Sequence, residues 1–426
     1  MKSKLEITLW VALTLGIVLR AVNVLDAPVT TDEAQFLLGV PHSQPPLIFW
    51  LLTGVQWLFG PDLMMTRAVT VLVGISSLAL VYLLWKELFG EEHALLAAVI
   101  AALVPGHIAF SRVVYLDVYL VFAWLGLAYV YVRTLQNEKD GLSILFLFVT
   151  ALLATFIKSQ GFMFIGLLLL HRFWVKRRVV FSDPIVQVLI LALIPIACYF
   201  VAHPKILATS FANIEREAFG LSLGRLLDIA TMWWEQNRLF TLLMLAGVPF
   251  LKRAGWLINS LCLLALVLPF LFGAGHIYYS AYTIAFAFLG VFALIQMKER
   301  VREGALLLLG LNAFLILGPR QLWESPWQHE WFRERAYWND NADKVNAVLA
   351  GADEITVVTP VGHEARWYLE PKIRVLAPDA LTNVTGYIVQ MTNLSQPVTL
   401  TGSIVVHEDE HVRVLFIAAD ETGQAE

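Results

Sequence analysis

The sequence predicts a polytopic α-helical membrane protein of about 11 transmembrane helices, followed by a small soluble α/β domain. Composition is the first observation: 58% of the 426 residues are hydrophobic and only 15% are charged. Soluble proteins carry about 25% charged residues. Patterning is the second, because long apolar stretches recur through the first 320 residues and then give way to short β-rich runs.

The apolar stretches define the transmembrane part, residues 1–320. An α-helix needs about 20 mostly apolar residues to cross a bilayer. The candidate spans are residues 6–25, 66–86, 93–110, 114–133, 141–158, 160–175, 184–202, 237–251, 254–273, 276–297 and 304–319. The first stretch lacks a small-residue cleavage site, so we expect a retained helix and not a signal peptide. Cys198 and Cys262 lie in apolar stretches and predict neither a disulfide nor a metal site.

Basic residues indicate the orientation of these spans. Lys and Arg accumulate in cytoplasmic loops. With a cytoplasmic N-terminus, most of them fall in connections on that side, for example Lys86 and the groups within 172–178 and 298–302. The loop 203–236 and everything after residue 320 are then extracytoplasmic, and we expect a multi-pass protein of a plasma membrane. The net charge of −4 argues against nucleic acid as a partner.

The first external loop, residues 26–65, contains a short apolar segment at 45–60 that begins with Pro45 and Pro46. The segment is too short to span a membrane comfortably, so we expect a helix lying in the outer interface. Proline is tolerated in the first turn of a helix and marks its start.

The last hundred residues differ from the rest. Residues 321–342 are aromatic and charged, which is typical of an interfacial linker. Residues 343–426 predict a soluble extracytoplasmic α/β domain. Its strands are expected in EITVVTP, KIRVLAP, GYIVQM, SIVVHE and HVRVLFIA.

Ionisable side chains at membrane depth are costly and indicate functional sites. One group falls at the external ends of the predicted spans or in the loops beyond them: Arg20, Asp32, Glu33, His42, Arg112, Asp117, Lys158 and His276. Three structural alternatives stay open. Asp32 and Glu33 also suit the first turn of a capped helix, and Asp117 and Lys158 also suit a buried salt bridge. Tyr278 and Tyr279 suit either an aromatic belt or phosphate coordination.

These motifs, in this order, resemble the GT-C glycosyltransferases, specifically the protein O-mannosyltransferase and aminoarabinose-transferase group. The similarity covers roughly residues 5–297. It begins with a first span that ends in Arg20 and is followed by the Asp32–Glu33 pair. The segments QPPLIFWL, SRVVYLDVYLVFAW, KSQG and YYSAYTIAFAFLG then follow in sequence.

The resemblance implies an enzyme that moves a sugar from a polyprenyl-phosphate donor outside the cytoplasm. The acceptor would be a hydroxyl, amine or phosphate group on a lipid, glycan or protein. Asp32 would act as the general base, beside Glu33, in a displacement that inverts the anomeric carbon. Such a reaction needs positive charge for the donor phosphate. The residues expected to bind the substrates are Lys158, Arg20, Arg112, Asp117, His42, His276, Tyr278 and Tyr279.

The chain departs from this group between Asp32 and Pro45. The segment is shorter than in the family, Gln44 takes the place of a histidine, and His42 is displaced. No cofactor is required by the sequence, although Asp32, Glu33 and Asp117 could supply oxygen ligands for a divalent cation.

Two other functions are alternatives to the transferase. A transporter or flippase for polyprenyl-linked sugars would place charges near the membrane midplane, in repeated halves. This sequence has no internal repeat, and its charges gather at one face. The second alternative is a non-enzymatic membrane scaffold that acts through its soluble tail. Such a protein would not need ionisable side chains gathered at one face of the membrane.

Overall fold

The computed structural model describes residues 4–22, 24, 29, 31–37, 45–60, 62–158, 160–177, 181–204, 223–272, 282–317, 342–358, 369, 372–376, 386–391, 403–408 and 412–417. The chain divides into two compact units. The first comprises residues 1–24 and 42–326, and the second comprises residues 25–41 and 327–426.

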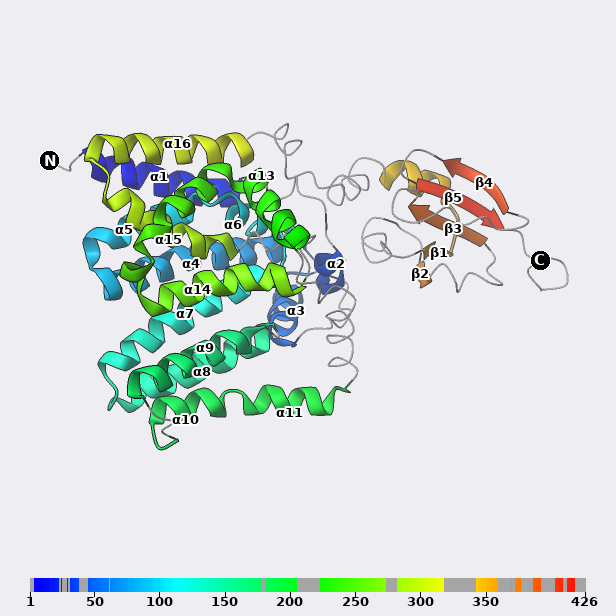
Figure 1. The fold of residues 1–426 in the computed structure, drawn as a ribbon. Coiled ribbons are helices and arrows are strands. Elements are labelled where there is room, and N and C mark those ends of the chain that lie inside the picture. Colours follow the sequence, from blue (N-terminus) through cyan, green and yellow to red (C-terminus); the bar gives the residue numbers. More distant parts are fainter. Residues whose placement is uncertain are drawn as a thin grey trace. The chain divides into compact units, whose positions relative to one another are not determined.

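The first unit is a bundle of α-helices, many of which run side by side (Figure 1). Its described helices are α1 (Lys4–Ala21), α3 (Leu47–Phe59), α4 (Leu63–Phe89), α5 (Glu91–Ala102), α6 (Pro105–Phe110), α7 (Leu116–Gln136), α8 (Gly141–Ile157), α9 (Gly161–Lys176), α10 (Pro184–Leu191), α11 (Ile194–Ala202), α13 (Leu223–Gly247), the 3₁₀ turn η1 (Val248–Phe250), α14 (Leu251–Phe272), α15 (Ile284–Ile295) and α16 (Glu299–Leu317).

Each of the eleven predicted stretches contains a described helix. Four helical segments of the described chain are both long and apolar enough to cross a membrane: Leu63–Phe89, Leu116–Gln136, Pro184–Ala202 and Arg238–Ala265. The protein is therefore a membrane protein, while the count of about 11 spans stays a prediction.

Proline divides two of the predicted spans. The stretch 93–110 forms α5 and α6, and Pro105 is in the first turn of α6. Proline has no N–H to continue the hydrogen-bond ladder of the preceding helix, so it ends one helix and begins the next. The stretch 184–202 likewise forms α10 and α11, with a proline in the first turn of α11.

The prediction of a loop over residues 203–236 was wrong for its second half, because α13 (Leu223–Gly247) begins there. The charged side chains Arg225, Asp228 and Glu235 lower the hydropathy of residues 223–236. A criterion based on continuous apolar length therefore places the start of this helix at residue 237, although α13 is continuous from Leu223.

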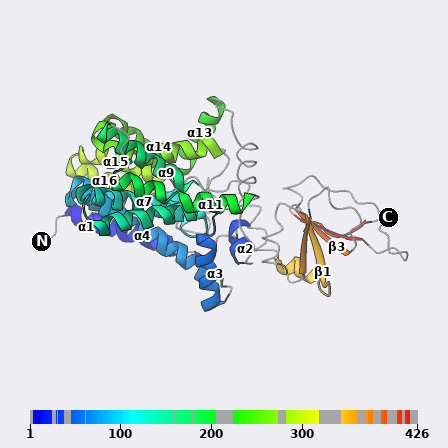
Figure 2. The same ribbon diagram turned by 90° about the horizontal axis from the view of Figure 1, so that it is seen from below.

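Helix α3 lies where the interfacial helix was expected, directly after Pro46. Ile48 and Leu52 are buried, whereas Trp57, Leu58 and Phe59 are exposed, Trp57 by 84%. Figure 2 shows α3 projecting from the bundle beside α4. An apolar helix with an exposed aromatic end suits the membrane interface, and that location stays a prediction.

The core of the first unit runs through α5, α6 and the start of α7, where every residue from 96 to 121 is buried. This segment carries Arg112 and Asp117. Both charged side chains are thus enclosed by the bundle and require partners inside it.

The second unit contains α2 (Thr31–Leu37), a helical segment at 342–348 and a five-stranded sheet. The strand order is β2 (Lys372–Leu376), β1 (Glu354–Val358), β3 (Gly386–Met391), β5 (Val412–Ile417) and β4 (Ser403–Glu408). β1 pairs in parallel with β2 and β3, while β5 pairs antiparallel with β3 and β4.

The hydrophobic core of this unit joins the sheet to the helical segment. Val345 and Leu349 cluster with Val357, Val389 and Val414. All five predicted strand segments contain a described strand. The predicted domain limits 1–320, 321–342 and 343–426 stay predictions, and residues 318–341 lie outside the described ones.

Candidate functional site

A buried ion pair joins two of the predicted site residues. Lys158 Nζ lies 2.8 Å from Asp117 Oδ1. A third residue completes the cluster, because Tyr282 donates its hydroxyl hydrogen to the same Asp117 oxygen at 2.5 Å. Asp117 and Tyr282 are each 2% exposed and Lys158 is 7% exposed. One carboxylate oxygen therefore receives two hydrogen bonds away from solvent.

Three helix ends bring this cluster together. Asp117 lies in the first turn of α7, where the helix dipole favours a negative charge. Lys158 follows the last residue of α8 in an extended conformation. Tyr282 comes two residues before α15. The starts of α7 and α15 and the end of α8 place the three side chains at one end of the bundle.

Aromatic side chains support Tyr282 from within the bundle. The ring of Trp124 lies 5.4 Å from that of Tyr282, and 6.1 Å from that of Phe164. Trp124 follows Asp117 by seven residues on α7, so the two share one face of the helix. The contact with Trp124, which itself packs on Phe164, restricts the rotamers of Tyr282 and holds its hydroxyl toward Asp117.

The energetics of the pair depend on both partners. Removing two charges from water is costly, and deleting one member of a buried pair leaves the other charge uncompensated, at about 3–5 kcal/mol. Asp117 therefore fixes the position of the Lys158 ammonium. A cation held in this way at a helix end can bind a phosphate oxygen.

Arg20 lies at the same end of the bundle, but its guanidinium contacts the backbone. It donates to the carbonyls of Gly16 and Ala102, both at 2.7 Å, and to that of Ala101 at 3.4 Å. Its Nη2 also lies 3.0 Å from Nδ1 of His107. Ala101 and Ala102 end α5 before Pro105, and carbonyls at a helix end lack intrahelical partners. Arg20 supplies those hydrogen bonds.

Arg112 and Arg67 act in a similar way. Arg112 donates through Nε to the Leu19 carbonyl at 2.7 Å, and through Nη2 to the same oxygen. Arg67 donates to the Val24 carbonyl at 2.6 Å. Both arginines are fully buried. Positive charge near the last residues of α1 also suits the negative end of its dipole.

Sequence reasoning did not select Tyr282, Arg67 or His107. Tyr282 belongs to the YYSAYT motif, in which Tyr278 and Tyr279 were chosen instead. Its position near the start of the predicted span 276–297, at the end shared by Asp117 and Lys158, was the available signal.

The remaining predicted residues are less fully described. The backbone of Asp32 and the whole of Glu33 lie in α2, and Glu33 is fully buried. The side chain of Asp32, and all of His42, His276, Tyr278 and Tyr279, lie outside the described residues. Within the described part of the chain, no three His, Cys, Asp or Glu side chains are grouped to hold a metal ion.

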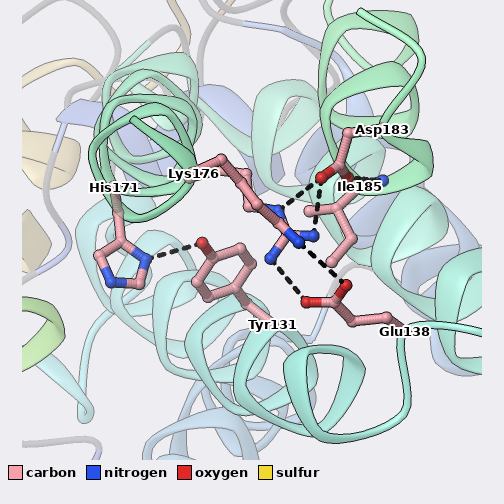
Figure 3. Close-up of polar contacts among 7 residues, drawn as sticks. Tyr131, Glu138, His171, Lys176, Asp183 and Ile185 are labelled. Carbon is pink, nitrogen blue, oxygen red and sulfur yellow. Dashed lines mark hydrogen bonds and ion pairs between the residues drawn. The ribbon is translucent and has the colours of Figure 1, made fainter. Parts of the chain in front are cut away.

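A second polar cluster lies near the C-terminal ends of α7 and α9, at the end of α7 away from Asp117 (Figure 3). Arg172 binds Glu138 and Asp183, each at 2.7 Å, and Lys176 lies 3.5 Å from Glu138. Asp183 also accepts a hydrogen bond from the Ile185 backbone and so caps α10. The Arg172 hydrogen bond, with Lys176 adding to it, holds the pKa of Glu138 below its usual value. Every charge in this cluster is paired, as expected of a structural link.

Two comparisons concern the sequence. Residues 43–201 match the family model described as dolichyl-phosphate-mannose-protein mannosyltransferase. Over 86 residues the chain is 34% identical to YycA of Bacillus subtilis, a protein to which mannosyltransferase activity is attributed. That match covers 20% of this chain and 13% of the relative.

Solved structures resemble the chain over nearly its whole length. ArnT from Cupriavidus metallidurans, solved with undecaprenyl phosphate bound, has a TM-score of 0.62 at 13% identity. The alignment covers 96% of this chain and 97% of ArnT. The oligosaccharyltransferase of Archaeoglobus fulgidus, tethered to an acceptor peptide, has a TM-score of 0.57 at 13% identity. That alignment covers 91% of this chain and 69% of the enzyme.

Proposed function

Because the chain has the fold of the GT-C membrane glycosyltransferases, we propose that it transfers a sugar from a polyprenyl-phosphate donor to an acceptor outside the cytoplasm. The observation that carries this proposal is the buried Asp117–Lys158 pair with Tyr282. Asp117 and Lys158 both fall within the segment that matches the mannosyltransferase family model.

Asp32 is proposed as the general base. Its carboxylate would take the proton from an acceptor hydroxyl as that oxygen attacks the anomeric carbon of the donor. The bond between this carbon and the phosphate oxygen breaks in the same step, and the electron pair leaves with the polyprenyl phosphate. Attack from the opposite face inverts the anomeric configuration. Glu33 would lie beside the base or bind a divalent cation with it.

Lys158 is proposed to bind the phosphate of the donor. A polyprenyl phosphate leaves with negative charge, and a fixed cation stabilises that charge as it develops. Arg20 and Arg112 are weaker candidates, because their guanidinium groups are buried against backbone carbonyls. Asp117 and Tyr282 would position Lys158, and the role of His42, His276, Tyr278 and Tyr279 in substrate binding stays a proposal.

Substitution of the acidic pair tests the function. We expect Asp32→Asn to abolish sugar transfer while the purified protein still binds the donor and remains folded. Transfer is measured with radiolabelled polyprenyl-phosphate sugar, and folding by thermal unfolding in detergent. Glu33→Gln provides the neighbouring control and should retain part of the activity. Wild-type turnover in both variants would refute the catalytic assignment.

A further inference from the structure

Asp117 uses only half of its capacity to accept hydrogen bonds. Within the described part of the chain it accepts two, from Lys158 at 2.8 Å and from Tyr282 at 2.5 Å, and both go to Oδ1. The residue is 2% exposed, so water has little access to the other oxygen, Oδ2. A buried polar atom without a hydrogen bond is costly and rare in folded proteins. Oδ2 therefore suits a partner that the protein itself does not supply.

A second buried aspartate shows what a purely structural carboxylate does in this protein. Asp183 accepts from the Ile185 backbone through Oδ1 at 2.9 Å, and from Arg172 Nε through Oδ2 at 2.8 Å. The chain itself thus satisfies both of its oxygens (Figure 3). Asp117 also lies at the start of a helix, yet no described residue donates to its second oxygen. Neutralising Lys158 therefore accounts for only one of the two oxygens of Asp117.

The missing partner of Oδ2 must donate a hydrogen bond and must not be negatively charged. A phosphate group is unsuitable, because a carboxylate repels it. A hydroxyl fits, since it can donate, and its hydrogen bond to a carboxylate is about twice as strong as one between neutral groups. The sugar of a polyprenyl-phosphate donor carries such hydroxyls beside its phosphate. The acceptor hydroxyl fits less well, because in an inverting reaction it attacks from the face opposite the phosphate.

The position of Oδ2 indicates which sugar hydroxyl it meets. Both oxygens of a carboxylate are bonded to one carbon atom, so Oδ2 also lies close to the Lys158 ammonium, whose side chain keeps 9% of its exposure. The hydroxyl must consequently be close to the phosphate that Lys158 is proposed to bind. In a glycosyl phosphate the phosphate is attached to the anomeric carbon, and the adjacent ring carbon carries the 2-hydroxyl. Of the sugar hydroxyls, this one is nearest to the phosphate.

We propose that Asp117 Oδ2 accepts a hydrogen bond from the 2-hydroxyl of the donor sugar while Lys158 binds the adjoining phosphate. The inference rests on the proposed function, because it assigns both groups to one polyprenyl-phosphate sugar. Hydrogen bonds to the 2-hydroxyl strengthen in the oxocarbenium-like transition states of glycosidic cleavage, so this contact serves recognition and transfer alike. Asp117 then selects donors at their second carbon, because a sugar without the 2-hydroxyl leaves Oδ2 buried and unpaired.

Donor binding to the purified full chain tests the proposal without an acceptor. Undecaprenyl-phosphate mannose and undecaprenyl-phosphate aminoarabinose are each compared with their 2-deoxy analogue, because both sugars carry a 2-hydroxyl. Dissociation constants are measured by titration in detergent. We expect the wild type to bind the 2-deoxy analogue at least about tenfold more weakly than the parent donor, since one hydrogen bond to a charged group is lost.

The variant Asp117→Asn assigns this difference to Oδ2. Lys158 can only donate, so the amide oxygen of the asparagine faces it and the amide nitrogen takes the place of Oδ2, where it cannot accept. We expect this variant to bind a donor and its 2-deoxy analogue equally. Tyr282→Phe is the matched control, because it removes a hydrogen bond from Oδ1 and leaves Oδ2 unaltered. It should keep the preference for the 2-hydroxyl.

The outcomes separate this assignment from the proposed function. Equal binding of both donors by the wild type, or an undiminished preference in Asp117→Asn, would overturn the role of Asp117 and leave the proposed function in place. If neither sugar donor binds, the proposed function itself fails. The comparison of donors on the wild type needs no substitution, so it decides the question even where Asp117→Asn does not fold.

Discussion

The cationic side chains at one end of the bundle perform two kinds of task. Arg20, Arg67 and Arg112 donate to backbone carbonyls near the ends of α1 and α5. Arginine suits this task because its planar group presents several N–H donors in fixed directions. Lys158 instead pairs with a carboxylate. Its ammonium is a compact point charge, which suits a phosphate that arrives and leaves.

Substitutions at Lys158 and Asp117 separate a structural role from a phosphate-binding role. Lys158→Met should lower the free energy of unfolding by about 3–5 kcal/mol, because Asp117 is left as an unpaired buried charge. The double variant Asp117→Asn/Lys158→Met should recover most of that stability. We expect donor affinity to remain at least about tenfold lower in both variants, since a charged hydrogen bond is lost.

Thermal unfolding and donor titration, carried out on the same preparations, check both expectations. If the double variant binds the donor as well as the wild type does, Lys158 serves only as a partner for Asp117. The proposed phosphate site would then have to lie elsewhere.

At the scale of helices, close approach of backbones decides where the buried cations lie. A Cβ atom on Gly16 of α1 would overlap the carbonyl oxygen of Ala102 at the end of α5. Arg20 then binds both the Gly16 and the Ala102 carbonyls. Small residues at helix contacts are typical of membrane bundles, because van der Waals packing is a main attraction there. Gly16 allows the two helices to approach closely, and Arg20 links them through hydrogen bonds.

Gly16→Ala should therefore separate α1 from α5. We expect a loss of about 1–3 kcal/mol in stability, as for other overpacked cores. The matched control is Gly166→Ala in α9, where an added Cβ meets no atom within 4 Å. The control should be neutral or slightly stabilising, because alanine favours helices over glycine by about 1 kcal/mol. Melting temperatures of the two variants make the comparison, and equal values would contradict it.

The link between the α7–α8 turn and α9 should depend on pH. The pKa of Glu138 is lowered in the folded protein, chiefly by its hydrogen bond from Arg172. A lowered pKa means that the stabilising contribution is present above the unfolded-state pKa and is lost as the pH falls through the folded-state pKa. Glu138→Gln should consequently melt at a lower temperature than the wild type near pH 7.

As the solution is acidified below the ordinary glutamate pKa of 4.5, the melting temperatures of wild type and Glu138→Gln should converge. Melting curves recorded at intervals between neutral and acidic pH test this. A constant difference across the range would mean that Glu138 contributes by packing and not by charge.

At the scale of the whole molecule, orientation follows from the uneven distribution of Lys and Arg. That distribution predicts a cytoplasmic N-terminus and an extracytoplasmic tail. A reporter fused after residue 426 should accordingly be active only outside the cytoplasm, and one fused after Lys86 only inside. A cytoplasmic signal from the first fusion would contradict the odd number of spans on which the external site depends.

The sequence alone predicted the helical stretches, the strand-rich tail and the Asp117–Lys158 pairing as one of two alternatives. Apolar length and residue period are local properties, so they can be read along the chain. The sequence predicted that Arg20 and Arg112 lie at the same end of the bundle as Asp117 and Lys158. It did not predict their carbonyl partners, for example Ala102, because those are distant in sequence.

Only the tertiary structure decided which atoms meet. Tyr282 reaches Asp117 across 165 positions of sequence, and no local pattern specifies such a contact. The sequence by itself therefore determined most helices and strands and the location in a membrane, because segments that lie in lipid must be long and apolar. Packing between distant elements determined the buried Tyr282–Asp117–Lys158 cluster, because hydrogen bonds depend on distances that only the folded chain sets.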